Sequence, residues 1–268
     1  MGRTLGLLSA DLAGMMGEQV DDVPDVGNTN SFDSERLKRK SDAYYDDWYG
    51  RFYAGTHINT SFDVATSTQT EGKITFTPTL SAPVDATDLY YLSMEWEPEE
   101  LIRGINNAIE MVEDEALEDV VNETLLVADS VYEYVIPSEF RNLEFVYQES
   151  STADRYSRFS GLVPDAHWRI LRTTPRKLWF DPDLANLTVD RNLRLVGQKD
   201  PSRLTLDSDV TQVSPAFVLQ QAKALLHQSR IRGDGAEFSE HRSQMALAQG
   251  MADRERARIA VAPRGWPV

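Results

Sequence analysis

The sequence predicts an α+β fold in which strands and helices occupy separate blocks of the chain. Short β-type runs fill residues 46–98 and 130–200, whereas apolar residues recur at helical spacing in 98–129 and in much of 201–262. These blocks do not alternate as they do in parallel-sheet proteins, and no internal repeat of fixed period is visible. We therefore expect a small antiparallel sheet or barrel, a sandwich-like region and long helices. The chain of 268 residues divides into four parts, 1–45, 46–129, 130–200 and 201–268.

The first part, residues 1–45, is predicted to be a flexible N-terminal arm with short helices. Apolar residues in 4–16 share one helical face, although Gly6 and Gly14 weaken that helix. Residues 17–35 are rich in Asp, Asn, Gly, Pro and Ser, a composition typical of a loop. Ser34 is placed to cap a short helix that runs toward Tyr45.

The second part, residues 46–129, is predicted to be a small β domain followed by a long acidic helix. Ile74 and Phe76 alternate as in a half-buried strand, and 89–96 forms an aromatic second strand. Pro98 suits the first turn of a helix. An apolar stripe then follows at intervals of three and four, formed by Ile102, Ile105, Ile109 and Val112. A second periodic stretch, residues 117–126, extends the predicted helix to 129.

The last two parts return to strands and then to helices. Residues 130–200 contain short β-type runs separated by Pro, Asp and Asn, which favours a sandwich. In 201–268, Ser214 and Pro215 begin one helix, and residues 237–259 form a second that leads into a tail.

The residues that carry chemistry do not form a recognisable catalytic or metal-binding motif. The chain has no cysteine, its four histidines lack metal-binding spacing, and no phosphate-binding loop or nucleophile elbow is present. We therefore expect no enzymatic activity, no cofactor and no metal. A hydrolase that uses carboxylate pairs drawn from residues 95–119 is the enzymatic alternative. No apolar run approaches the ~18–20 residues that cross a bilayer, so we expect no membrane association.

Charge instead indicates surfaces for assembly. The net charge of −16 disfavours wrapping of DNA but is compatible with a wall along which DNA slides. Residues 95–119 hold ten carboxylates and one basic residue, Arg103. A solvated helix face is one reading of that segment. A surface for assembly or along a channel is the other, with candidates Glu99, Glu100, Glu110, Glu113 and Asp114.

The C-terminal part is mildly basic and supplies a possible counterpart. Between Lys223 and Arg264 there are eight basic and five acidic residues. A solvated helix end with a loose tail is one interpretation. A partner-contact tail is the other, with candidates Arg254, Arg256, Arg258 and Trp266. An acidic helix and a basic tail on one chain would suit head-to-tail packing of copies in a ring.

Three stretches of sequence carry a resemblance to a known family. They are EGKITFTPTLSAPVDATDLYYL (71–92), EPEELIRGINNAIEMV (97–112) and LRLVGQKDPSRLTLDSDVTQVSPAFVLQQAKALL (193–226). In this order they are similar to a strand pair, a helix, and a strand, Asp-x-Asp turn and helix of the head–tail connector (neck or adaptor) proteins of tailed bacteriophages. The chain departs from the family at Gly104, where alanine is usual, and at Ala86-Thr87-Asp88, where Gly-Asp is usual.

The resemblance implies a structural virion protein at the head–tail junction, assembled in the cytoplasm of the bacterial host. It implies a ring of copies, often twelvefold, that contacts the portal protein and tail or stopper proteins while phage DNA only passes through the channel. A capsid decoration protein or a tail tube or terminator subunit is the alternative.

Overall fold

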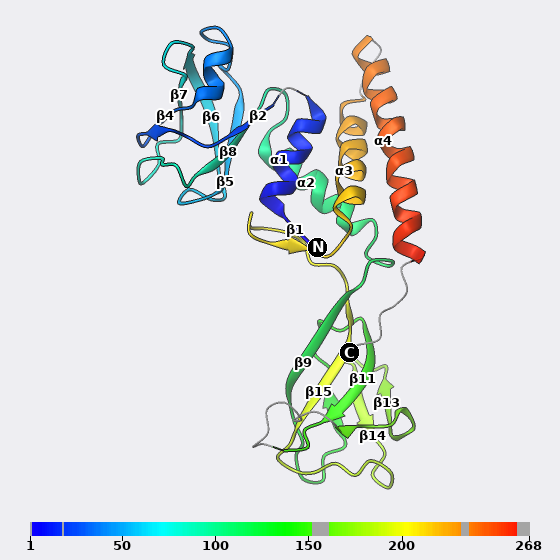
Figure 1. Cartoon of the computed structure of the whole chain (residues 1–268). Coiled ribbons are helices and arrows are strands. Elements are labelled where there is room, and N and C mark those ends of the chain that lie inside the picture. Colours follow the sequence, from blue (N-terminus) through cyan, green and yellow to red (C-terminus); the bar gives the residue numbers. More distant parts are fainter. Residues whose placement is uncertain (1, 18, 152–160, 232–235, 262–268) are drawn as a thin grey trace. The chain divides into compact units, whose positions relative to one another are not determined.

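The chain folds into two compact units. The computed structural model describes residues 2–17, 19–151, 161–231 and 236–261 (Figure 1). The first unit, which we call the discontinuous unit, combines residues 1–116 with 201–268, and the second, the inserted unit, comprises 117–200. Both contain antiparallel sheets, and the helices of eight residues or more that the described residues form lie in the discontinuous unit. The predicted α+β class is therefore confirmed.

A curled, seven-stranded antiparallel sheet forms a half-barrel in the discontinuous unit, which confirms the predicted small sheet or barrel. Its strand order is β2-β8-β5-β6-β7-β4-β3. The strands are β2 (Gln19–Asp22), β3 (Val26–Gly27), β4 (Ser31–Asp33), β5 (Tyr49–Ala54), β6 (Thr60–Thr68), β7 (Lys73–Thr77) and β8 (Leu89–Ser93). Alternate side chains enter one apolar core because successive residues of a strand face opposite sides.

Aromatic rings dominate that core. Phe32 is fully buried, and its ring centroid lies 4.5 Å from that of Tyr90 and 5.8 Å from that of Phe52. The rings of Phe62 and Phe76 complete the cluster around it. Tilted and edge-on pairs of this kind stabilise a core beyond the apolar area that they bury.

The prediction of a flexible arm over residues 17–35 was wrong. Strand β2 pairs with β8, and β4 pairs with β7, so this segment supplies strands to the half-barrel. Val20 and Phe32 bury their side chains there. Asp, Asn and Pro residues of this segment form the tight turns between its short strands. The strands themselves are stabilised by pairing with β7 and β8. The short helix after Ser34 is a 3₁₀ helix (Glu35–Arg39), and the Ser34 hydroxyl caps it.

Four helices and a short strand pair complete the described part of the discontinuous unit. They are α1 (Leu5–Met16), α2 (Pro98–Glu110), α3 (Pro215–Arg230) and α4 (Ala236–Val261), with β1 (Arg3–Thr4) paired to β16 (Val210–Thr211). Figure 1 shows α3 and α4 running side by side, and α2 packs on α3. The helices share an apolar core that includes Leu8, Ile105 and Phe217.

Gly104 lies where helix α2 packs on α3. A Cβ atom at this position would lie 3.1 Å from Cγ of Leu226, tighter than most real Cβ contacts. The missing side chain therefore allows α2 to approach α3 closely.

The predicted long acidic helix is also corrected. Helix α2 ends at Glu110, and Glu118–Leu126 is strand β9, which pairs with β15. A β-bulge gives β9 one extra residue between Asn122 and Leu125. Because of this bulge, Val120 and Leu125 both pack on one core although five positions separate them. The bulge thus imitates helical spacing in the sequence.

The inserted unit consists of two antiparallel sheets around one core, as expected for a sandwich-like region. The sheet orders are β12-β11-β15-β9 and β10-β14-β13. Val146 and Leu195 of the first sheet share a core with Leu178 and Phe180 of the second. Besides β9, the strands are β10 (Glu133–Val135), β11 (Asn142–Gln148), β12 (Gly161–Leu162), β13 (Trp168–Leu171), β14 (Lys177–Phe180) and β15 (Asn192–Lys199).

Candidate functional site

A buried ion pair connects the half-barrel to the segment that precedes α3. Nε of Arg51, on β5, lies 3.0 Å from Oδ2 and 3.1 Å from Oδ1 of Asp207, and both side chains are almost completely buried. The backbone N–H of Asn59 also donates to Asp207, at 3.0 Å. Burial raises the pKa of Asp207, and the guanidinium of Arg51 opposes this rise. Asp207 belongs to the Asp-x-Asp turn of the family resemblance.

The candidate Glu99 extends this network. Its Oε1 accepts a hydrogen bond of 2.6 Å from Ser61, whose Oγ accepts one of 2.9 Å from Arg51. Glu99 lies in the first turn of α2, where a negative charge also favours the helix dipole. The structure therefore gives this carboxylate a role within the unit.

The candidates Glu100 and Glu110 also have partners within the unit. Oε2 of Glu100 lies 3.0 Å from Arg230 on α3, and Oε1 of Glu110 lies 3.6 Å from Arg203. Each pair is partly exposed, so each contributes modest stability. The acidic side chains were expected to pair with basic side chains of a neighbouring copy, but these two pair with arginines of their own chain.

The other two acidic candidates, Glu113 and Asp114, lie after α2 in an exposed turn. Next to them, Glu115 makes a bidentate ion pair with Arg256 of α4, with distances of 2.6 Å and 2.9 Å. The hydrogen bonds from Arg256 lower the pKa of the Glu115 carboxyl. This pair joins the acidic turn to α4. Arg256, one of the predicted partner-contact residues, therefore has its partner within its own chain.

The remaining tail candidates differ from one another. Arg258 pairs with Glu255 one turn earlier, at 2.6 Å, whereas Arg254 lies on the exposed side of α4. Trp266 lies outside the residues that the structure describes.

Helix α4 also presents apolar side chains to solvent. Leu247 and Met251 are 57% and 41% exposed, and Arg254 and Arg258 continue the same side of the helix at helical spacing. The side of the helix that packs on the unit buries Ala248 and Ala252. Two exposed apolar side chains one helical turn apart form a small apolar surface that another protein could cover.

Two histidines meet between α3 and α4. Nδ1 of His227 lies 2.9 Å from Nδ1 of His241. Burial, with smaller effects of Lys223 and His241, lowers the pKa of His227 to about 4, from an ordinary value near 6.5. The folded chain therefore resists protonation of this ring.

This shift predicts a loss of stability in mild acid. Between pH 6.5 and pH 4 the unfolded chain binds a proton at His227 that the folded chain does not, so the free energy of unfolding falls as pH is lowered. We expect a loss on the order of 2 kcal/mol from this partly screened group, measured by urea denaturation at pH 7 and pH 4.5. His227→Gln should flatten this dependence, whereas His167→Gln in the inserted unit should leave it unchanged. A wild-type profile that matches that of His227→Gln would contradict the assignment.

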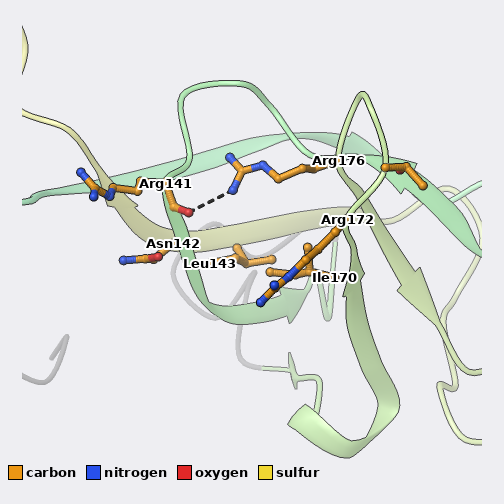
Figure 2. Close-up of a pocket in the computed structure, with 7 residues that line it drawn as sticks. Arg141, Asn142, Leu143, Ile170, Arg172 and Arg176 are labelled. Carbon is orange, nitrogen blue, oxygen red and sulfur yellow. Dashed lines mark hydrogen bonds between the residues drawn. The ribbon is translucent and has the colours of Figure 1, made fainter. Parts of the chain in front are cut away.

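The inserted unit contains a pocket rich in arginine, with a volume of about 490 Å³ (Figure 2). Arg141, Arg172 and Arg176 line it, and Leu143 and Ile170 add apolar surface. We call it the arginine pocket. Figure 2 shows Arg176 directed at the carbonyl oxygen of Arg141, to which it donates a hydrogen bond of 3.0 Å.

Sequence reasoning missed this pocket. Its residues come from the start of β11 and from the end of β13 and the turn after it, about 30 positions apart. The three arginines are unremarkable in sequence. Strands β11 and β13 belong to different sheets, so the packing of the two sheets brings the arginines together. The spacing of Arg172 and Arg176 around a proline was the one local signal.

Within the described residues, no group of three or more histidines, aspartates or glutamates is arranged to hold a metal ion. No helix in the described ranges is both long enough and apolar enough to cross a membrane. Comparison of the chain with protein-family models and with curated proteins found no match.

Proposed function

We propose that this protein is a structural subunit of the head–tail connector of a tailed bacteriophage, forming a ring between the portal and the tail. The observation that carries the proposal is the solvent-facing apolar side of α4, on which Leu247 and Met251 lie beside two arginines. A face of this composition supports contact with another protein surface. The sequence resemblance supplies the kind of assembly.

The pairing of charges inside the chain refines this proposal. Glu100, Glu110 and Glu115 are held by arginines of their own unit. These carboxylates therefore stabilise the protomer, and contact between copies is assigned to other surfaces. We propose together with this a location in the virion, assembly into a ring, the portal protein as partner, and a purely structural role.

The number of copies per particle tests the proposal. We expect about a dozen copies per virion, as quantitative mass spectrometry of purified particles would measure, because closed rings have a fixed small number of subunits. Hundreds of copies would instead favour a capsid decoration or tail tube protein. Absence from particles, or turnover of a substrate by the purified chain, would refute both structural assignments.

A paired variant tests the α4 face. The purified chain should be monomeric or weakly associating and should form rings when mixed with portal protein, as light scattering would measure. Leu247→Glu combined with Met251→Glu should abolish ring formation. Arg242→Glu is the matched control, because Arg242 is exposed on the same helix but lies about 140° around its axis from Leu247. Equal loss in both variants would refute the role of this face.

A further inference from the structure

The arginine pocket carries positive charge for which its own lining supplies no carboxylate. Arg176 donates to the backbone carbonyl oxygens of Arg141 and Phe140, which are neutral acceptors. Arg141 pairs with Asp200 outside the pocket lining, at 2.5 Å. Arg172 is exposed and makes no ion pair with any residue in the described ranges. In a chain with a net charge of −16, two guanidinium groups without a carboxylate partner form a site for an anionic group.

The apolar part of the pocket favours an occupant that has an apolar group as well as negative charge. Leu143 and Ile170 line it and are only half buried. A phosphodiester backbone would satisfy the arginines and leave these side chains in water. A peptide segment that combines carboxylates with one apolar side chain would cover both.

The same chain presents a segment of this composition. The residues Met94–Glu97, which we call the acidic bend, join β8 to α2. Met94 is 59% exposed, and the side chains of Glu95 and Glu97 are exposed on either side of Trp96. No ion pair of Glu95 or Glu97 is found among the residues that the structure describes.

The acidic bend is also held in a fixed form, which favours binding because little conformational entropy is lost. Trp96 is buried, and its backbone N–H donates to Oγ of Ser93 at 3.3 Å. The guanidinium of Arg230 lies over the Trp96 ring, 4.6 Å from its centroid. Met94 and the two glutamates are therefore presented to solvent from a rigid support.

We propose that the arginine pocket of one copy binds the acidic bend of a second copy. Met94 lies on Leu143 and Ile170, and Glu95 and Glu97 pair with Arg172 and Arg176. The two surfaces differ, so the contact is heterologous and propagates from copy to copy, as closure of a ring requires. That this contact closes a ring in a virion rests on the proposed connector function. The contact itself follows from the charges and apolar side chains of the two surfaces.

The absence of cysteine from the natural chain allows a direct test. A disulfide forms only between Cα atoms within about 7 Å of each other, so it reports the contact even when association is weak. We choose Thr173→Cys at the pocket and Glu97→Cys at the acidic bend, which gives up the pair of Glu97 and keeps that of Glu95 with Arg172. The full-length chain with both substitutions should form a ladder of covalent multimers on oxidation, whereas each single variant should stop at collisional dimers.

Charge reversal provides the matched controls. In the double-cysteine chain, Glu95→Lys or Arg172→Glu should each reduce the ladder by about tenfold, and both together should restore it, because the pair is then complementary again. A ladder that is indifferent to these changes would overturn the proposal. A monomer closed by an internal disulfide would also overturn it, since the contact would then lie within one chain.

Nucleic acid gives the remaining outcome. If Arg172→Glu abolishes retention of duplex DNA by the wild-type chain and leaves the ladder intact, the pocket is a phosphate site and the proposal fails. The copy number per virion is measured separately. A connector location with no ladder refutes only this contact, and a ladder in a protein absent from the neck refutes only the connector assignment.

Discussion

Replacement of Asp207 by alanine is expected to lower the free energy of unfolding of the discontinuous unit by about 3–5 kcal/mol. The substitution leaves the guanidinium of Arg51 buried without its close carboxylate partner. Oε1 of the exposed Glu99 lies 3.9 Å away and compensates only weakly, and burial of a poorly paired charge is strongly unfavourable. The substitution also removes the acceptor for the N–H of Asn59. Urea denaturation, followed by the circular dichroism of helices α1 to α4, all of which belong to this unit, measures the loss.

Two further variants separate this effect from the loss of any ion pair. Glu110→Ala removes an exposed pair with Arg203 and should cost less than about 1 kcal/mol. Arg51→Met combined with Asp207→Leu removes both charges together and should recover most of the stability lost in Asp207→Ala. If the single Asp207 variant behaved like Glu110→Ala, the buried pair would not be holding the half-barrel to the segment before α3.

The second of the three stretches quoted above packs on the part of the third that lies in the discontinuous unit, residues 201–226. Asn106 in the second stretch exchanges hydrogen bonds of 2.8 Å and 2.9 Å with the backbone of Leu204 in the third. Gly104 packs against Leu226 in the same pair of stretches. These residues of the second and third stretches therefore serve packing and hydrogen bonding between elements of the unit.

Helices and strands that are determined by residues close together in the chain were predictable from the sequence. Helix α3 begins at Pro215 as predicted, and α4 includes the predicted 237–259, because proline and the apolar repeat act within a few residues. Strand β7 includes Ile74 and Phe76, whose alternation requires no knowledge of a partner strand.

Elements that depend on a distant partner were not predictable. The bulge in β9 is defined only by its register against β15, about 70 residues later. The strands of the supposed arm are likewise defined by β7 and β8. The spacing of apolar residues within a short stretch of sequence contains no information about a distant partner strand. A bulged strand is therefore predicted as a helix, and short paired strands are predicted as a loop.

The candidate surfaces follow the same division. Sequence identified the acidic segment and the basic tail by composition, but it could not show that Glu115 and Arg256 neutralise each other across 141 positions. The arginine pocket likewise depends on contact between distant segments, because its residues come from two different sheets. Composition thus locates charge along the chain, and the fold determines which charges remain for a partner.

Replacement of Phe32 by alanine should be the second large effect, lowering the free energy of unfolding of the discontinuous unit by about 3–5 kcal/mol. The ring is fully buried and contacts Phe52 and Tyr90 within the aromatic core. Removing it leaves a cavity that the surrounding strands fill only in part. Urea denaturation gives the size of the effect.

Val23→Ala is the matched control, since Val23 lies in the same 17–35 segment with its side chain 36% exposed. It should change stability by less than about 0.5 kcal/mol, as exposed substitutions usually do. A flexible arm would make both variants equally harmless, because a residue that is not packed in the folded state loses nothing when it is truncated. A large difference between Phe32→Ala and Val23→Ala therefore requires that β4 is an integral strand of the half-barrel.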